Sequence, residues 1–335
     1  MYKSKFKPLD KRRNLLRSLV SSAVGLPFVL LARWTKWDID GRQRLLFAVE
    51  EHQRTGRGLV TLSNHVSALD DPLVQIAMLC PFDFNERTKI WHSIACDADF
   101  SPTGGSFADG LARACFSVAN LVYVSRTKRR GRQPRTGDAE MLSRFAARTD
   151  ERLRRRLQAR ARELGTDVDS YVTSFVTTPY KHASSKRLSL LNQIGLLEAC
   201  ARCDTGDWIH IFPEGGRSKT VKLGRVHAGL GKILYYTDPI VVPLCMYGTQ
   251  DVLPINALVP RLHKSVAVTV GYPIEHSALS GWREAPPTIA TFRRLAEIAM
   301  SRVASLRGAT LARYYATQST GLTPKAPPKM RSVTT

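Results

Sequence analysis

Short apolar runs that alternate with longer segments constrain the fold of this chain more than any other feature of its sequence. From Gly58 onward the runs lie at residues 59–63, 90–96, 121–125, 208–212, 240–247 and 266–270, and stretches with helical character lie between them. Alternating strands and helices are typical of a sheet whose faces are covered by helices. We therefore predict an α/β fold with a central, mostly parallel sheet flanked by helices.

The ends of the chain differ from this central region. Residues 1–40 have a basic start and an apolar stretch at 19–32, which is shorter than the roughly 20 apolar residues of a membrane-spanning helix. Basic residues before this stretch and Trp34 and Trp37 after it are typical of a helix in the membrane interface. We expect residues 1–40 to be an interfacial membrane-anchoring segment, with a buried core helix as the alternative. The catalytic domain is expected at 41–316, and a disordered tail at 317–335.

The net charge of +22 predicts an anionic partner. Basic residues concentrate in residues 127–186, which we expect to be a partly helical insertion; within it, residues 127–162 carry a narrow apolar stripe on a basic helix. An anionic membrane surface suits this helix, and a solvated helix packed lightly on the domain is the alternative. Because zinc-finger spacing and an aromatic-rich RNA-binding signature are lacking, we expect no nucleic-acid partner. A basic nucleic-acid-binding protein stays as a distant alternative.

The first candidate site follows the apolar run at 59–63. His65 and Asp70 stand five positions apart in the sequence Asn-His-Val-Ser-Ala-Leu-Asp that begins at Asn64. A carboxylate can hold one imidazole nitrogen while the other faces a substrate, and imidazole titrates near neutral pH. The pair therefore predicts a general base that deprotonates a hydroxyl. Ser67 is expected to bond Asp70 or the substrate, because the chain lacks the Gly-x-Ser-x-Gly turn of a serine nucleophile.

The second candidate site is Phe212-Pro-Glu-Gly-Gly-Arg-Ser218, which follows the run at 208–212. A strand that ends in Pro and Gly-Gly predicts a tight turn with charged side chains at the edge of the sheet. Arg217 can grip a phosphate through two bonds, and Glu214 can bond a hydroxyl or brace the arginine. Backbone N–H groups near Gly215, or near Pro243 in the run at 240–247, are candidates to stabilise an oxyanion.

Together the two motifs resemble those of the glycerolipid acyltransferases, Asn-His-x-Ser-x-x-Asp and Phe-Pro-Glu-Gly-x-Arg-Ser. The resemblance implies a glycerol-3-phosphate acyltransferase-like fold and O-acyl transfer with His65 and Asp70 as catalytic residues. It also implies that Arg126, at the end of Val-Tyr-Val-Ser-Arg, and Pro243 lie at the substrate. Substrate contacts are accordingly expected from Asn64, Ser67, Arg126, Glu214, Gly215, Arg217 and Pro243.

Within this family the chain is most similar to the tafazzin branch, which remodels phospholipids such as cardiolipin by transacylation. Asp70-Asp71-Pro72 and Asp251-Val-Leu-Pro254 carry this narrower resemblance. It implies phospholipid and lysophospholipid substrates at a mitochondrial membrane in a eukaryote, or at the cytoplasmic face of the inner membrane in a bacterium. Gly216-Arg217-Ser218 instead resembles the lysophosphatidate acyltransferases, so an acyl-coenzyme A-dependent lysophospholipid acyltransferase is the alternative.

We expect neither a metal nor a resident cofactor. Cys200 and Cys203 form a C-x-x-C pair, but no second cysteine or histidine pair accompanies them. They are expected to be ordinary helix residues, and acyl-coenzyme A would enter only as a donor substrate in the alternative function.

Overall fold

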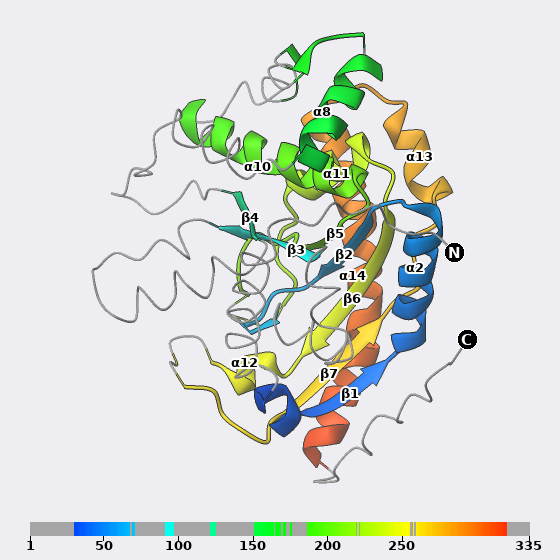
Figure 1. Ribbon diagram of the computed structural model, residues 1–335. Helices are drawn as coiled ribbons and strands as arrows, with labels where there is room; N and C mark the ends of the chain where they lie inside the picture. The colour runs from blue at the N-terminus through cyan, green and yellow to red at the C-terminus, as the bar shows by residue number, and fades with distance from the viewer. Residues whose placement is uncertain are drawn as a thin grey trace, which may run out of the picture.

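The protein has an α/β fold, in which a mixed sheet lies between two layers of helices (Figure 1). A computed structural model of the chain describes residues 30–67, 69–70, 91–96, 121–124, 151–163, 165–168, 170–171, 175, 186–218, 220, 222–254, 257 and 259–319. Within these ranges, the side chains of 91–96, 121–124, 151–153, 186–192 and 194 are not described.

The sheet has seven strands in the order β1-β7-β6-β2-β5-β3-β4. Strand β6 pairs in parallel with β2 and antiparallel with β7, and β2 also pairs in parallel with β5. The sheet is therefore mixed, with a parallel centre as predicted. The strands are β1 (Lys36–Asp40), β2 (Leu59–Ser63), β3 (Trp91–Cys96), β4 (Leu121–Val124), β5 (Trp208–Ile211), β6 (Ile240–Tyr247) and β7 (Ser265–Val270).

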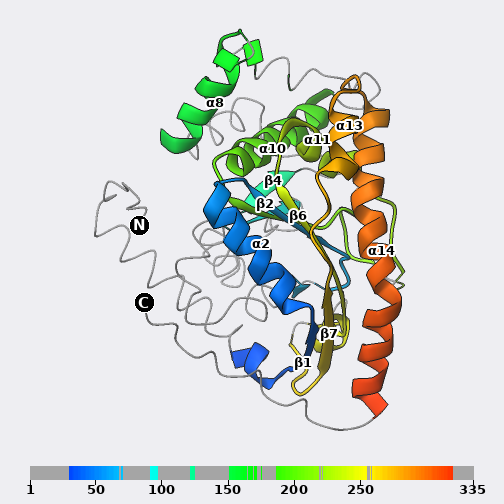
Figure 2. The ribbon, with the colours of Figure 1, turned by 90° about the vertical axis from the view of Figure 1, so that its right-hand side faces the viewer.

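Two hydrophobic clusters cover the two faces of this sheet. Along β6, Val241 and Cys245 face one cluster, and Val242 and Met246 face the other, as the alternation of side chains along a strand requires. The first cluster is completed by helices α10, α11 and α14, and the second by α2; Figure 2 shows α14 and α2 on opposite sides of the sheet. The helices are α2 (Arg42–Thr55), α8 (Glu151–Glu163), α10 (Lys186–Asp204), α11 (Ala228–Tyr236), α12 (Thr249–Val252), α13 (Ser277–Arg283) and α14 (Ile289–Ser319).

The ends of the chain enter the fold further than expected. Strand β1 lies inside the segment assigned to membrane anchoring, where it pairs with β7 through backbone hydrogen bonds. Helix α14 continues to Ser319, past the expected start of the tail at residue 317. Its last turns are tied to the domain because the hydroxyl of Tyr314 donates a hydrogen bond to Asp251 of α12. Residues 320–335 lie outside the described residues.

Only residues 30–34 of the expected anchoring helix are described, and they are helical. Within the described ranges, no helix is long and apolar enough to cross a membrane. The expected placement of residues 19–29 in a membrane interface therefore stays a prediction.

The described part of the basic insertion packs on the domain. Leu157 and Ala161 of α8 are buried in the cluster that includes α10. Arg156 of α8 lies 3.7 Å from Asp204 at the end of α10, and Arg160 bonds Glu163 at 2.8 Å. Burial raises the pKa of Asp204 to about 6, although the two arginines oppose this rise. Helix α8 is thus docked through an apolar face, with part of its positive charge paired.

The cysteines of the C-x-x-C pair lie on α10, as predicted. Cys200 and Cys203 are free thiols buried in the core, and desolvation raises the pKa of the Cys203 thiol to about 12. A buried thiol that stays protonated is a poor nucleophile and a poor metal ligand, so these side chains act as small core residues.

Candidate active site

The two predicted motifs meet at the carboxyl-terminal ends of neighbouring parallel strands. The first motif follows β2 and the second follows β5, and Leu62 and Ile211 are partners in the pairing of these strands. The backbone of Ser218 donates a hydrogen bond of 2.7 Å to the carbonyl of His65. Residues separated by about 150 positions in the sequence therefore form one site.

His65 and Asp70 form the predicted pair. Nδ1 of His65 lies 2.8 Å from Oδ2 of Asp70. Because Asp70 is fully buried and its carboxylate accepts hydrogen bonds, Nδ1 of the imidazole is the protonated nitrogen and donates this bond. The His65 side chain is 19% exposed, and its Nε2 makes no hydrogen bond with the described residues. The arrangement leaves a free lone pair for a substrate proton.

Asp70 is held by more donors than the sequence indicates. The backbone N–H groups of Val66 and Ser67 donate bonds of 2.6 and 2.8 Å to Oδ2, and the hydroxyl of Thr249 donates to Oδ1. Hydrogen bonds to a carboxylate favour its charged form and fix its orientation. Asp70 is therefore positioned to hold His65 and to stabilise an imidazolium. Thr249 was not among the predicted site residues, although it follows β6, which ends at the same edge of the sheet.

Glu214 braces the two motifs against each other. Its Oε1 accepts the backbone N–H of His65 at 3.0 Å, and its Oε2 accepts that of Gly224 at 2.5 Å. The carboxyl group is buried, and this desolvation raises its pKa. Within the described residues Glu214 forms no ion pair with Arg217, so it braces His65 and not the arginine. Its predicted bond to a substrate hydroxyl stays a prediction.

Two rings fix the plane of the His65 imidazole. The ring of Phe212 stacks on His65 with centroids 4.1 Å apart and an interplanar angle of 17°. On its other side, Phe212 meets the fully buried His210 edge to face at 4.7 Å. Desolvation lowers the pKa of His210 to about 3, and the nearby His65 contributes to the same shift.

His210 is a structural histidine that the sequence analysis missed. Its Nδ1 lies 2.8 Å from the hydroxyl of Thr61, and its Nε2 lies 3.3 Å from that of Ser63. Thr61 also accepts the indole N–H of Trp208 at 2.8 Å. The signal was a single histidine inside an apolar strand, which predicts a neutral ring bonded to neighbouring hydroxyls.

The other two polar side chains of the first motif, Asn64 and Ser67, support the backbone. The amide of Asn64 donates to the carbonyl of Met246 and accepts from its N–H, both at 2.8 Å. The hydroxyl of Ser67 donates to the carbonyl of Leu253 at 3.1 Å. Both side chains are buried. Asn64 ties the loop after β2 to the end of β6, and Ser67 ties it to the residue after α12. The predicted contacts of both with substrate stay predictions.

The two regions predicted to supply oxyanion donors, around Gly215 and around Pro243, lie in different elements. Gly215 has a left-handed φ of 63°, and its N–H donates a bond of 2.9 Å to the carbonyl of Phe212, so this N–H closes the turn. Pro243 lies inside β6, paired with Leu62 of β2. Neither observation tests a role in oxyanion binding.

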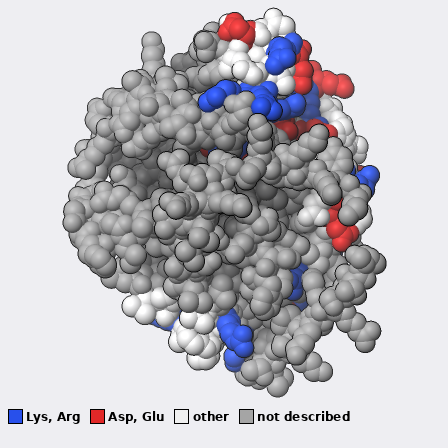
Figure 3. Space-filling view, in the orientation of Figure 1, with Lys and Arg blue, Asp and Glu red and all other residues white. Residues whose placement is uncertain are grey.

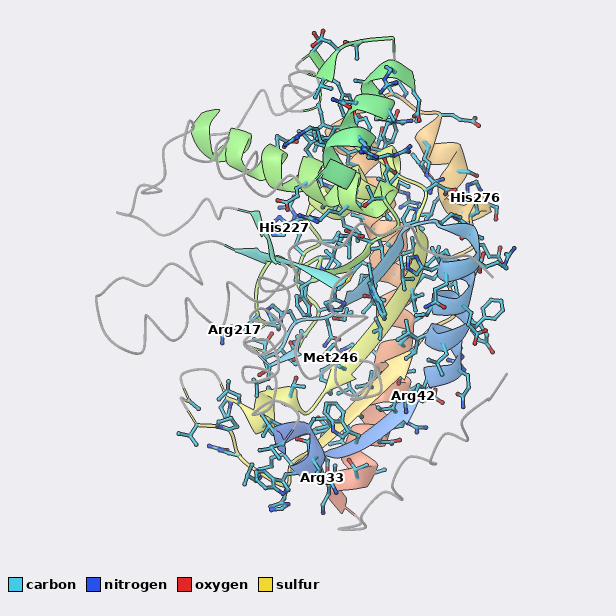
Figure 4. The ribbon with its side chains drawn as sticks, in the orientation of Figure 1. Arg33, Arg42, Arg217, His227, Met246 and His276 are labelled. Atoms are coloured by element: carbon cyan, nitrogen blue, oxygen red, sulfur yellow. The ribbon has the colours of Figure 1, made fainter. Side chains whose placement is uncertain are left out.

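Arg217 is exposed, in contrast to the buried Glu214 of the same turn. It forms no ion pair or hydrogen bond with the described residues, and Figure 4 shows it on the left of the molecule, away from Arg42 of α2. A guanidinium that none of the described residues pairs is the kind of group that can bind a lipid phosphate. Arg126, the other predicted phosphate ligand, lies outside the described residues.

The chemistry available at this site is proton transfer at Nε2 of His65, next to an exposed cation. Within the described residues, no group of three or more His, Cys, Asp or Glu side chains could hold a metal ion.

Comparisons with known proteins agree with the resemblance. Residues 136–247 match the family model described as Acyltransferase. This range contains the turn at 212–218 and strand β6, and the His65–Asp70 motif lies before it.

Among curated proteins, the chain is 36% identical over 73 residues to tafazzin of Drosophila melanogaster. This match covers 21% of this chain and 19% of that protein. It is 34% identical over 92 residues to N-acylphosphatidylethanolamine synthase of Arabidopsis thaliana, covering 25% and 32% of the two chains. It is 31% identical over 93 residues to a chloroplastic 1-acyl-sn-glycerol-3-phosphate acyltransferase of the same plant, covering 28% and 26%. The chain thus spans a third or less of the length of these relatives.

A solved structure of the 1-acyl-sn-glycerophosphate acyltransferase of Thermotoga maritima aligns over 91% of this chain and 84% of that protein, with 13% identity and a TM-score of 0.42. The family-model match and the curated relatives confirm the predicted resemblance to the lysophospholipid acyltransferases, tafazzins included, and they support the prediction of an O-acyltransferase.

Proposed function

We propose that this chain, which carries an acyltransferase-family domain, transfers an acyl group from a phospholipid to the hydroxyl of a lysophospholipid, with His65 as general base. The tafazzins and glycerophosphate acyltransferases among its relatives support lipid acyl transfer. The observation that carries the proposal is the 2.8 Å bond between Nδ1 of His65 and buried Asp70, which leaves Nε2 free beside the Glu214 turn.

In the first step, Nε2 takes the proton of the acceptor hydroxyl, and the hydroxyl oxygen attacks the carbonyl carbon of the donor ester. Asp70 stabilises the imidazolium that forms, as a carboxylate does in a hydrolase triad. The stacked ring of Phe212 keeps the imidazole in one plane, so the lone pair keeps its direction. The acceptor oxygen is the nucleophile, and no covalent enzyme intermediate forms.

In the second step, the tetrahedral intermediate expels the alkoxide of the donor lipid. The imidazolium of His65 returns the proton to this oxygen, which releases a lysophospholipid and restores the neutral base. One ester bond forms and one breaks, so the reaction is close to balanced in free energy and needs no coenzyme. Arg217 holds the phosphate of one lipid at the mouth of the site.

The alternative keeps the same acceptor chemistry and takes the acyl group from acyl-coenzyme A. It is favoured by Gly216-Arg217-Ser218, which resembles the lysophosphatidate acyltransferases. In either function the enzyme meets its lipids at a membrane, which is consistent with peripheral association.

Incubation of the purified chain with radiolabelled phospholipid and unlabelled lysophospholipid, without coenzyme A, tests the proposal. We expect label to appear in the newly acylated lipid, and we expect His65→Ala to prevent this transfer. A strict requirement for an acyl thioester would replace the transacylase with the alternative. Absence of transfer from both donors would overturn the function altogether.

A further inference from the structure

Two segments that are far apart in the sequence expose large apolar side chains at one end of the molecule. In the first, Leu30 is 40% exposed and Trp34 is 46% exposed. In the second, which follows α12, Val259 is 76% exposed and Leu262 is 46% exposed. Exposed apolar side chains that cluster mark interaction surfaces more often than isolated ones do.

Backbone hydrogen bonds join the two segments. The N–H of His263 donates to the carbonyl of Trp34 at 3.1 Å, and the N–H of Lys36 donates to that of Lys264 at 2.9 Å. We call residues 30–36 and 259–264 together the docking lip. Because both its parts are fixed to each other, the lip is one surface and not two loops.

The docking lip contains cations and no carboxylate. Arg33 and Arg261 are exposed, and neither stretch of the lip contains Asp or Glu. Figure 4 shows Arg33 at the lower end of the molecule, below α12, and the described residues at the lower edge of Figure 3 are coloured as cations and neutral residues. Helix α8 differs, because its arginines lie beside Glu163 and Asp204, and Figures 1 and 2 both show it at the opposite end of the fold.

The buried side of the docking lip packs on the catalytic motif. Leu31 and Ala32 belong to the same core cluster as Leu69, next to Asp70, and Val252 of α12. The chain then returns to the lip from α12, where the N–H of Arg261 donates to the carbonyl of Val252 at 2.7 Å. Helix α12 also begins with Thr249, whose hydroxyl bonds Asp70. The lip is therefore rigidly connected to the catalytic pair.

We propose that the docking lip seats the protein on the surface of an anionic phospholipid bilayer, so that lipids enter the site beside His65 from this edge. Exposed aromatic and aliphatic side chains flanked by cations fit the interface of such a bilayer, where apolar groups insert and cations meet phosphates. The inference rests on the proposed lipid chemistry and names the surface that serves it. It assigns the membrane contact to this edge and not to α8.

Vesicle sedimentation tests the proposal with the full chain. We expect it to bind vesicles of phosphatidylglycerol and phosphatidylcholine, and we expect Trp34→Ser combined with Leu262→Ser to weaken this binding at least tenfold. The matched control is Phe47→Ser, because Phe47 is 62% exposed on α2 but lies beside Glu50 and Glu51. Arg33→Gln combined with Arg261→Gln should weaken binding to the anionic vesicles and leave weak binding to pure phosphatidylcholine unchanged.

Fluorescence measures insertion directly. Vesicles with brominated acyl chains should quench part of the tryptophan emission, and Trp34→Phe should remove most of that quenching. Quenching that persists in Trp34→Phe, or equal losses of binding in the lip variant and in Phe47→Ser, would overturn the proposal. The proposal would also be overturned if the wild-type protein were a dimer without lipid and the lip variant were a monomer. A second copy of the chain would then occupy the surface.

The binding assays need no turnover, so they separate this inference from the proposed function. Vesicle binding lost in the lip variant, together with normal transfer between lipids in mixed micelles, supports both. Failure of all acyl transfer with intact lip-dependent binding would refute the chemistry alone.

Discussion

The catalytic pair and the phosphate-binding arginine of the proposed site are built in opposite ways. Asp70 is fully buried and accepts hydrogen bonds from His65, Val66, Ser67 and Thr249. Arg217 is exposed and has no partner in the described part of the chain. The first half of the proposed site is fixed by hydrogen bonds within the protein, whereas among the described residues the second half has no partner.

This difference predicts how each half contributes to the reaction. A preorganised base acts on the chemical step, because its orientation and charge stabilisation are needed in the transition state. A single exposed cation contributes mainly to binding, since it contacts a phosphate that is present throughout the reaction. Substitutions in the buried half should therefore lower kcat, and substitutions of Arg217 should raise KM.

The largest effect is expected from His65→Ala. Removal of the general base should lower kcat by roughly 10²–10⁴-fold, while the fold persists because the side chain is partly exposed. Steady-state transfer rates and thermal unfolding measure the two properties. His276→Ala, at an exposed histidine near Asp238 on another side of the molecule, is the matched control and should leave kcat unchanged. More than about a tenth of wild-type kcat in His65→Ala would exclude this histidine as the base.

A stability test addresses the buried half without using activity. The pKa of His210 is lowered from 6.5 to about 3 in the folded protein, so between these values the unfolded chain binds the extra proton. Stability should therefore fall as the pH falls below 6.5, by about 1.4 kcal/mol per pH unit, or about 2 kcal/mol at pH 5.

Urea unfolding of the wild type and of His210→Asn at pH 7.5 and pH 5 measures this loss, and the variant should lack this part of it. Equal pH dependence in the two proteins would show that His210 is protonated in the fold. Its network with Thr61 and Ser63 would then carry a charge, and His210 would not be a neutral structural histidine.

Thr249→Val tests whether the donors to Asp70 support catalysis. Loss of one hydrogen bond to a carboxylate is worth about 1.5 kcal/mol, so kcat should fall roughly tenfold with KM unchanged. Thr249→Ser keeps the hydroxyl and should restore most of the rate. A purely structural role would instead lower the melting temperature in both variants or change KM, and proton NMR of the His65 Nδ1–H would report whether the bond to Asp70 persists.

The smallest effect is expected from Arg217→Ala, which should raise the KM for the lipid by several-fold up to about tenfold and leave kcat nearly unchanged. Arg217→Lys should recover part of the affinity, because it keeps the charge but not the forked geometry. The control is Arg225→Ala, at another exposed arginine that follows the same turn. A fall in kcat without a change in KM would move Arg217 into the chemical half and remove the contrast between the two regions.

The sequence predicted the parts of the fold that depend on local pattern. The strands were placed within one or two residues, because each is a short apolar run bounded by turn residues. Strand β1 was missed, because Lys36–Asp40 alternates charged and apolar residues beside an apolar stretch that dominated the interpretation of residues 1–40. The antiparallel pairing of β7 was also not predicted, since strand direction depends on contacts between distant segments.

The same division applies to the site. His65 and Asp70 could be predicted because five positions separate them and one loop brings them together. Glu214 could be identified, but its brace to the backbone of His65 could not, because it depends on the parallel pairing of β2 with β5. Thr249 carries no local signal, and the lone histidine in an apolar strand indicates only a buried ring, so their contacts with Asp70 and with Thr61 and Ser63 appear only in the packed sheet.

The long helix α14 limits how far the protein can be truncated at its C-terminal end. Its first half fills the core, whereas its last turns contact α12 through the hydrogen bond from Tyr314 to Asp251. An expression variant that ends near residue 305 would keep the buried α14 side chains of the core up to Val303. It would lose the tie that steadies α12, so a well-behaved preparation of that kind should not be taken as a competent catalyst.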